Sequence, residues 1–261
     1  MNTEKYLNRI GLEDKDINPT EDCLRTLQRN HLLHVPFENL DIHWGRMIVL
    51  DVGAFYEKIV NAGRGGFCYE LNGLFNWLLN EIGYKTRIVS ARVSDGKGGF
   101  GEEFDHLAII VSIGEGEYLV DVGFGDFTAA PLQFKLDIQQ KDRNGLYCID
   151  HGRYEYFKVL KNEKGWENEY IFVDIERDLS EFEDMCNFHQ TSADSHFTRK
   201  KICSLMTENG RITLANDRFI ETIDGVKTES AVSTDKEFNE ILLREFGIDS
   251  AGTQATRLQR T

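Results

Sequence analysis

The sequence lacks any apolar run approaching the roughly 20 residues that a membrane-spanning helix requires. Its amino terminus, residues 1–5, is polar and has no apolar segment typical of a secretory signal. These two absences predict a protein of the cytoplasm that does not act in a membrane.

An excess of positive charge is also lacking, because 44 acidic residues outnumber 30 basic ones and give a net charge of −14. Such a surface repels phosphate backbones, which argues against general nucleic-acid binding. An anionic cofactor would need a local basic patch, and residues 196–201 (His-Phe-Thr-Arg-Lys-Lys) form the densest candidate. A solvated basic turn is an equally good interpretation of that segment.

Paired cysteines are the third absence. The five cysteines are odd in number and include no Cys-x-x-Cys, which argues against a zinc ribbon and a disulfide framework. Cys186 and His189 have helical i, i+3 spacing, but no further ligand cluster accompanies them, so no metal is expected. Most of the thiols are expected to be small buried apolar groups.

Hydrophobic periodicity divides the chain into three blocks of an α+β protein. Residues 1–83 are predicted to be mostly helical, 84–178 to form an antiparallel sheet or small barrel, and 179–250 to mix helices with short strands. The polar tail, 251–261, is predicted to be loose. No internal repeat is present, so the blocks are not copies of one another.

Local signals place the individual elements. Leu24, Leu27 and His31 recur at helical spacing before Pro36, and Asp51 is a plausible N-cap for a short helix. Gly83 fits the end of a helix that starts at position 68 and carries a long apolar stripe. A last amphipathic helix is expected around residues 238–246.

Strands are predicted at 86–93, 106–113, 117–122, 154–160, 169–173, 203–206, 211–214, 218–223 and 227–232. The segment Gly114-Glu115-Gly116 suits a hairpin. Asn209-Gly210 and Asp224-Gly225 suit two-residue turns, because both central positions tolerate positive φ.

Cys68 stands where a glycine-rich loop, Arg64-Gly65-Gly66-Phe67, turns into a helix. The partial positive charge of a helix N-terminus stabilises a thiolate and lowers the pKa of a cysteine. The glycines allow a sharp turn and a close approach by a substrate. A cysteine at this position is therefore a candidate nucleophile, although a lone cysteine at the first apolar position of a helix is more often a core residue.

A nucleophile needs a base, and the base needs an orienting group. His106 opens a predicted strand, and Asp121 ends the next one. With the hairpin centred near Gly114-Glu115-Gly116, residues whose numbers add up to about 228 lie opposite each other, so His106 and Asp121 are near-direct neighbours. An edge histidine paired with a strand-end aspartate is the alternative without catalysis. Asp105 is expected on the opposite face of the strand, where it cannot orient His106.

The motif Arg-Gly-Gly-Phe-Cys-Tyr-Glu-Leu-Asn resembles the nucleophile motif of the arylamine N-acetyltransferases. The resemblance extends over nearly the full chain, to about residue 248. Its ordered motifs are residues 35–39, 64–72, 105–107, 120–125, 190–198, 203–205 and 211–214.

The resemblance implies a helical bundle, a β-barrel and an α/β lid around a cysteine-protease-like core. It also implies ping-pong transfer of acetyl from acetyl-CoA, a co-substrate rather than a resident cofactor, to the nitrogen of aromatic amines or hydrazines. In this chain Cys68 would accept the acetyl group, His106 would be the base and Asp121 the orienting acid. Arg64 and Glu38 would form a structural ion pair. The positions similar to those lining the family's substrate pocket are Phe37, Val93, Phe124 and Phe197.

Two rival functions use the same residues. A cysteine hydrolase related to papain-like proteases or transglutaminases needs the same triad, and only the exclusion of water separates transfer from hydrolysis. A non-catalytic module that binds CoA or another small molecule would instead keep an unreactive thiol.

Overall fold

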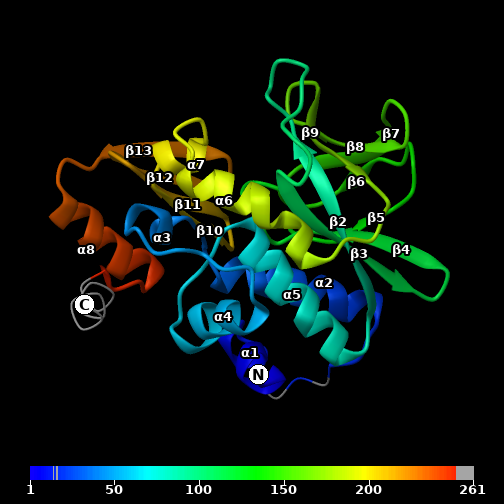
Figure 1. Ribbon diagram of the computed structural model, residues 1–261, viewed down its shortest axis with the longest axis horizontal. Helices are drawn as coiled ribbons and strands as arrows, with labels where there is room; N and C mark the ends of the chain where they lie inside the picture. The colour runs from blue at the N-terminus through cyan, green and yellow to red at the C-terminus, as the bar shows by residue number, and fades with distance from the viewer. Residues whose placement is uncertain (14, 16, 251–261) are drawn as a thin grey trace.

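The computed structural model describes residues 1–13, 15 and 17–250, which form a helical region, a β-barrel and a lid (Figure 1). The predicted loose tail, 251–261, lies outside these residues. None of the helices within the described ranges has the length and apolar character needed to cross a bilayer.

The described part of the helical region has two long helices, α2 and α5, and four shorter elements. Its elements are α1 (Thr3–Arg9), α2 (Glu21–His34), α3 (Leu40–His43), α4 (Val52–Tyr56), the π-helical turn η1 (Glu57–Asn61) and α5 (Cys68–Ile82). As predicted, the Asp51 carboxylate caps α4 by accepting the Ala54 N–H at 2.8 Å, and Gly83 ends α5 with a φ of 103°. The apolar stripe of α5, including Leu71, Phe75 and Leu78, is fully buried in the core of this region.

The barrel is an antiparallel sheet of eight strands in the order β5-β4-β3-β2-β9-β8-β7-β6. Its strands are β2 (Lys85–Val93), β3 (His106–Ile113), β4 (Gly116–Val120), β5 (Leu132–Gln133), β6 (Gln140–Lys141), β7 (Leu146–His151), β8 (Tyr156–Asn162) and β9 (Trp166–Val173). The Gln140 side chain joins the two edge strands, because it accepts the Gln133 N–H at 2.7 Å and donates to the Gln133 carbonyl at 2.9 Å. The sheet is therefore nearly closed, as the resemblance implied.

Strand β3 is buried on both faces, and this determines where the site residues point. Leu107 and Ile109 pack into the core shared with the helices, whereas Ala108 and Ile110 pack into the barrel interior. Because successive side chains of a strand alternate, a residue at an odd position and its even neighbour face different compartments.

The lid combines a second sheet with helices. Its elements are the 3₁₀ turn η2 (Leu179–Phe182), α6 (Glu183–Thr191), α7 (His196–Arg199), β10 (Ile202–Thr207), β11 (Gly210–Ala215), β12 (Arg218–Ile223), β13 (Val226–Ala231) and α8 (Asp235–Phe246). Strand β1 (Phe37–Glu38), from the helical region, extends this sheet by pairing with β10, so the order is β1-β10-β11-β12-β13. The β1 pairing brings Phe37 next to the lid.

One predicted turn is wrong and another is confirmed. Thr207 pairs with Gly210, so the first turn consists of Glu208 and Asn209 rather than Asn209-Gly210. Gly210 lies in β11, where a Cβ would sit 2.0 Å from the Thr222 carbonyl oxygen, so the glycine serves a close approach of two strands. Asp224 and Gly225 do form the predicted turn, with φ values of 49° and 81°. The division at residues 83 and 178 stays a prediction.

Candidate active site

The candidate nucleophile is the first residue of α5, as predicted. Cys68 is buried, with 3% of its surface exposed, and the residue before it, Phe67, has an extended backbone. The Phe67 N–H donates to the Glu70 carboxylate at 3.1 Å, which fixes the start of the helix from within its own first turn. The sulfur is therefore carried by a helix end whose geometry is well determined.

The two glycines before the nucleophile are required by close packing. A Cβ on Gly65 would lie 1.9 Å from the Pro36 carbonyl oxygen. Gly66 donates its N–H to that same oxygen at 3.3 Å and accepts the Glu38 N–H at 2.8 Å. The loop thus runs alongside β1 and is joined to it by backbone hydrogen bonds. A side chain at position 65 would prevent this close approach.

His106 and Asp121 meet at 2.6 Å between the imidazole Nε2 and the carboxylate Oδ2, and both side chains are buried. Because an ionised carboxylate only accepts hydrogen bonds, Nε2 carries the proton and Nδ1 carries the lone pair of the neutral ring. The second carboxylate oxygen accepts the Gly123 N–H at 2.9 Å. Both oxygens of Asp121 are therefore engaged.

The register of the hairpin differs from the prediction by about one position. Ile113 pairs with Gly116, so the turn has two residues, and the register continued past the last pair, Ile109 with Val120, would put position 123 opposite His106. Asp121 is consequently a diagonal neighbour of His106 on the same face. Diagonal pairs remain within reach of long side chains, which explains why the contact forms despite the different register.

Sequence reasoning missed Asn72, which ties the nucleophile helix to this pair. Its amide Nδ2 donates to the Leu107 carbonyl at 2.6 Å and to Asp121 Oδ1 at 2.9 Å, while its oxygen accepts the Val122 N–H at 2.8 Å. Asn72 is fully buried, so these bonds replace contacts with water. The only signal in the sequence was its i+4 position relative to Cys68, on the same side of the helix.

Cys68 and His106 line one cavity of about 230 Å³ together with all four predicted pocket residues, Phe37, Val93, Phe124 and Phe197. These four come from β1, β2, the loop after β4, and α7. The remaining members of the lining were not predicted as pocket residues: Asp105, Gly123, Gly125, His196, Lys200 and Ile202. Lys200 belongs to the basic segment 196–201, so part of that segment reaches the site.

Burial raises the pKa of the Cys68 thiol well above its usual range, and the charges of Asp105 and Asp121 raise it further, whereas a hydrogen bond from the Tyr69 backbone lowers it. Burial and these charges therefore oppose the lowering of the Cys68 pKa that a helix start favours. Loss of hydration disfavours the charged form of a buried thiol. A thiolate at this site has to form together with an imidazolium as a paired state.

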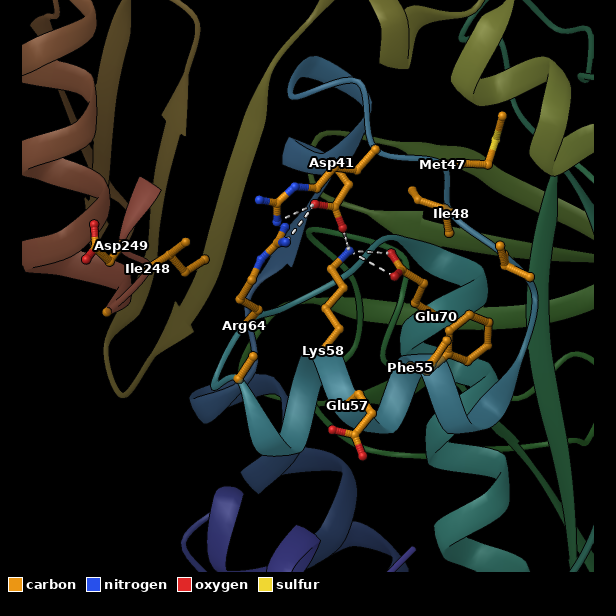
Figure 2. Close-up of a pocket in the computed structure, with 15 residues that line it drawn as sticks. Asp41, Met47, Ile48, Phe55, Glu57, Lys58, Arg64, Glu70, Ile248 and Asp249 are labelled. Carbon is orange, nitrogen blue, oxygen red and sulfur yellow. Dashed lines mark hydrogen bonds and ion pairs between the residues drawn. The ribbon is translucent and has the colours of Figure 1, made fainter. Parts of the chain in front are cut away.

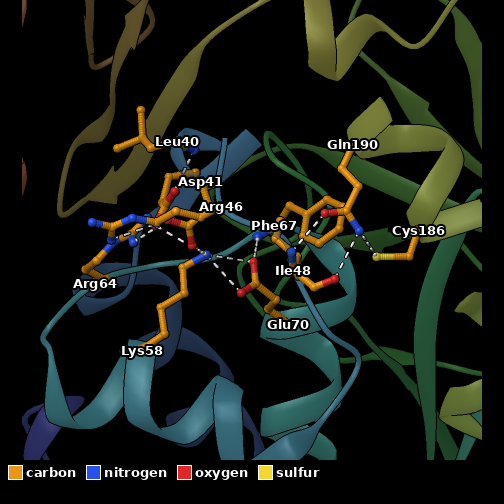
Figure 3. Close-up of polar contacts among 11 residues, drawn as sticks. Leu40, Asp41, Arg46, Ile48, Lys58, Arg64, Phe67, Glu70, Cys186 and Gln190 are labelled. Carbon is orange, nitrogen blue, oxygen red and sulfur yellow. Dashed lines mark hydrogen bonds and ion pairs between the residues drawn. The ribbon is translucent and has the colours of Figure 1, made fainter. Parts of the chain in front are cut away.

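Behind the nucleophile loop lies a buried ion cluster (Figure 3). Arg64 donates to Glu38 and to Asp41, each at 2.6 Å. Lys58 Nζ lies 2.9 Å from Asp41 and 2.8 Å from Glu70, the residue that accepts the N–H of residue 67. The Arg64–Glu38 contact is thus one part of a larger network, and the network ends on the helix that carries the nucleophile.

The ion cluster borders a second, larger cavity of about 830 Å³ (Figure 2). Lys58 and Arg64 point across it toward the carboxylates of Asp41 and Glu70. Its lining includes neither Cys68 nor His106. The smaller cavity is therefore the candidate site, because it brings the thiol and the imidazole together.

The other histidines and cysteines singled out in the sequence have separate surroundings. All five cysteines are free thiols. Cys186 contacts the Gln190 amide at 3.5 Å, and His189 contacts Asp105 and Ser195. Within the described part of the chain, no group of three or more His, Cys, Asp or Glu side chains is arranged to hold a metal ion. His31 is fully buried and bonds to the Tyr6 hydroxyl at 2.9 Å.

An α+β fold that gathers a thiol, an imidazole and a carboxylate beside an apolar cavity is shared with enzymes of the acyltransferase class. A family model described as N-acetyltransferase matches residues 20–255, and the chain belongs to the arylamine N-acetyltransferase family.

Three relatives illustrate the match. The arylamine N-acetyltransferase / N-hydroxyarylamine O-acetyltransferase of Salmonella typhimurium is 32% identical, and the alignment covers 93% of this chain and 87% of that protein. The solved structure of an arylamine N-acetyltransferase from Salmonella typhimurium matches with a TM-score of 0.88 at 29% identity, over 94% of this chain and 90% of the other. One from Bacillus cereus, described as having a Cys-His-Glu catalytic triad, matches with a TM-score of 0.88 at 26% identity, over 95% and 99%.

Proposed function

We propose that Cys68, His106 and Asp121 form a catalytic triad that transfers acetyl from acetyl-CoA to aromatic amines or hydrazines. The observation that carries this proposal is the 2.6 Å contact between His106 and Asp121 at a cavity that also contains the Cys68 thiol. Acetyl-CoA would act as a co-substrate that binds and leaves in each cycle. The Cys-His-Glu description of the Bacillus cereus enzyme concerns that protein, whereas position 121 here is an aspartate.

The first half of the proposed cycle loads the enzyme. His106 Nδ1 takes the proton of the Cys68 thiol, and the thiolate attacks the thioester carbonyl. Backbone N–H groups at the start of α5, including that of Cys68, would stabilise the oxyanion. The carbon–sulfur bond of the donor then breaks, and the CoA sulfur leaves with the proton that His106 holds. The product is an acetyl thioester on Cys68.

The second half of the proposed cycle removes the acetyl group from Cys68. The amine nitrogen attacks the thioester, His106 takes one proton from that nitrogen, and the Cys68 thiol is regenerated when the imidazolium returns the proton. Aromatic amines suit this step because they are weakly basic and hence largely unprotonated at neutral pH. Asp121 would hold the ring of His106 in the tautomer that leaves Nδ1 free to accept.

The cavity fits an aromatic acceptor. Phe37, Val93, Phe124 and Phe197 are half-buried and present apolar surface around the thiol. Aromatic side chains favour offset or edge-on contacts with a flat ring. Lys200 lines the same cavity and suits the anionic groups of CoA, which supports a role for the basic segment 196–201. Arg64 and Glu38 would steady the loop and would not touch substrate.

Intact-protein mass spectrometry tests the loading step. Incubation with acetyl-CoA should add one acetyl group to the protein, and addition of an arylamine should remove it with formation of the N-acetyl product. Cys68→Ala should abolish the adduct, whereas Cys148→Ala, which alters a half-buried thiol of the barrel, should retain it. An adduct that persists in Cys68→Ala, or one that water discharges as fast as the amine does, would refute transfer through this thiol.

The role of Asp121 needs a separate test. Asp121→Asn keeps the size but removes the charge that stabilises the imidazolium, and kcat should fall by roughly 10³–10⁴-fold. Asp121→Glu keeps the charge and should recover part of the loss. A near-normal rate for the asparagine variant would exclude Asp121 as the orienting acid. Assignment of the protein to the cytoplasm stays a prediction from the sequence.

A further inference from the structure

A second imidazole–carboxylate pair lies beside the first. Asp105 lies in the bend directly before β3, whose first residue is His106. The expectation that it sits on the opposite face of that strand is therefore wrong, because Asp105 and His106 line the same cavity. His189, from α6 of the lid, lies with Nε2 3.1 Å from Asp105 Oδ1 and 3.3 Å from the Asp105 backbone oxygen. The other carboxylate oxygen accepts the Val93 N–H at 3.3 Å. Two residues adjacent in the chain, Asp105 and His106, thus each belong to a different acid–imidazole pair.

The hydrogen bonds fix the orientation of the His189 ring. Both Asp105 oxygens near Nε2 are acceptors, so Nε2 is the donor. Nδ1 lies 3.3 Å from the Ser195 hydroxyl, which also accepts the Phe197 N–H at 3.2 Å at the start of α7. Ser195 is 2% exposed and is occupied as a cap, so it is no second nucleophile. The His189 side chain, also 2% exposed, is held on both sides.

The charge of Asp105 bears on the nucleophile. Asp105 and Cys68 line the same cavity. After burial, the Asp105 carboxylate is the largest influence raising the pKa of Cys68, ahead of Asp121. A carboxylate in that place opposes formation of a thiolate unless its charge is partnered. Among the described residues, His189 is the one basic side chain within 4.0 Å of the Asp105 carboxylate.

The residue before Asp105, Phe104, is itself held in place. Phe104 has a φ of 66°, which costs energy for a non-glycine residue. The Tyr69 hydroxyl donates to the Phe104 carbonyl at 2.7 Å, and its ring packs 6.1 Å from the ring of His189. The residue after the nucleophile, the strained turn and the lid histidine therefore converge on Asp105.

We propose that His189 is a positioning residue of this site, which clamps and partners the Asp105 carboxylate so that its charge does not oppose the Cys68 thiolate. This inference rests on the proposed role of Cys68 as the nucleophile. It assigns the lid an electrostatic task in addition to closing the cavity, because the partner of Asp105 comes from α6.

Several other titratable groups surround the two residues. Those facing Cys68 are His106, Asp121, Asp105, Tyr69 and Cys186, and those facing His189 are Asp105, Tyr69 and His196. The variants below leave all of these groups in place except the one being tested. The comparison is therefore between proteins that differ only in the partner or the charge of residue 105.

The test is the pH dependence of alkylation of Cys68 by iodoacetamide, followed on the peptide that contains this residue. His189→Leu should move the midpoint to higher pH by about one unit, because Asp105 loses its partner. His189→Gln retains an N–H donor and should restore most of the shift. In the double variant His189→Leu/Asp105→Asn, the carboxylate is gone and the midpoint should return to the wild-type value or below it.

Two outcomes overturn the inference. The first is a His189→Leu midpoint equal to that of the wild type. The second is a double variant whose midpoint is the same as, or higher than, that of His189→Leu, which indicates a purely structural role. If one variant does not fold, the comparison of the remaining variant with the wild type still gives the direction in which the alkylation midpoint moves. Alkylation requires no acetyl-CoA, so a failure of the acetyl-transfer proposal shows in the mass-spectrometric assay of wild-type protein and is distinguished from a failure here.

Discussion

Lys58→Met should be among the most destabilising substitutions in this protein. The Lys58 ammonium lies 2.8 and 2.9 Å from the two Glu70 oxygens, 2.9 Å from Asp41 and 3.6 Å from Glu38. The side chains of these three acids are 0–10% exposed. Methionine fills a similar volume but leaves the carboxylates with fewer cations, and uncompensated buried charge is the expensive result.

The expected loss in the free energy of unfolding of Lys58→Met is about 3–5 kcal/mol, the cost of breaking a buried ion pair by removing one partner. For a protein of this size each kcal/mol lowers Tm by about 2–4 °C, so a fall of about 6–20 °C is expected. Burial already raises the pKa of Glu70, and Lys58 opposes that effect. Without Lys58 the folded-state pKa of Glu70 rises further. The loss of stability should therefore be smallest at acidic pH and grow as pH rises through that pKa.

Urea unfolding, followed by fluorescence and circular dichroism at several pH values, measures this loss of stability and its pH dependence. Lys236→Met is the matched control, because Lys236 is 86% exposed and its i, i+4 ion pair with Glu240 spans 3.8 Å. That control should change stability by at most about 0.5 kcal/mol. Adding Glu70→Gln to Lys58→Met should recover part of the loss, since the amide oxygen can still accept the Phe67 N–H. A Lys58→Met effect no larger than the control would refute the reasoning.

Three further outcomes are expected. Asn72→Ala removes the hydrogen bonds to Leu107, Asp121 and Val122, so kcat/KM should fall at least tenfold. The control Asn80→Ala, at an exposed position of the same helix, should stay near the wild-type value. Equal activities of the two variants would contradict the role of Asn72. Gly65→Ala should yield unstable or inactive protein, because its Cβ would overlap a backbone oxygen, and a normal Tm with full activity would contradict this. Burial lowers the pKa of His31 from 6.5 to about 3. Because the unfolded chain then binds the proton more tightly, the free energy of unfolding should decrease as pH falls from 6.5 toward 3. His31→Gln should flatten this pH dependence of the urea midpoint.

Periodic elements could be predicted from the sequence because their pattern is local. The boundaries of β3 and β12 match the predicted ranges, and α5 begins and ends where its apolar stripe and Gly83 indicated. Strands β5, β6 and β7 were not predicted. The first two have only two residues each, which is too short for any alternation, and they are joined through the side chain of Gln140.

Long-range pairing was the other information that the sequence did not contain. Strand β1 exists because residues near 37 meet residues near 204, and no local signal encodes that contact. The same holds for Lys58 and His189, which reach their carboxylate partners across the fold. Cys68 and His106 could be singled out as candidates beforehand because each opens a regular element. Residues that act through tertiary contacts carry no pattern of their own.

The start of α5 explains how one short motif makes contacts on both sides of Cys68. At 3.6 residues per turn, Asn72 lies about 40° around the helix from Cys68, and Glu70 lies about 200° from it. Asn72 therefore faces the same side as the thiol and reaches Asp121, whereas Glu70 faces away and reaches Lys58. A helix is the element that permits this division, because on a strand residues 68, 70 and 72 would all share one face. Moving the cysteine by one position would change its orientation relative to both Asn72 and Glu70.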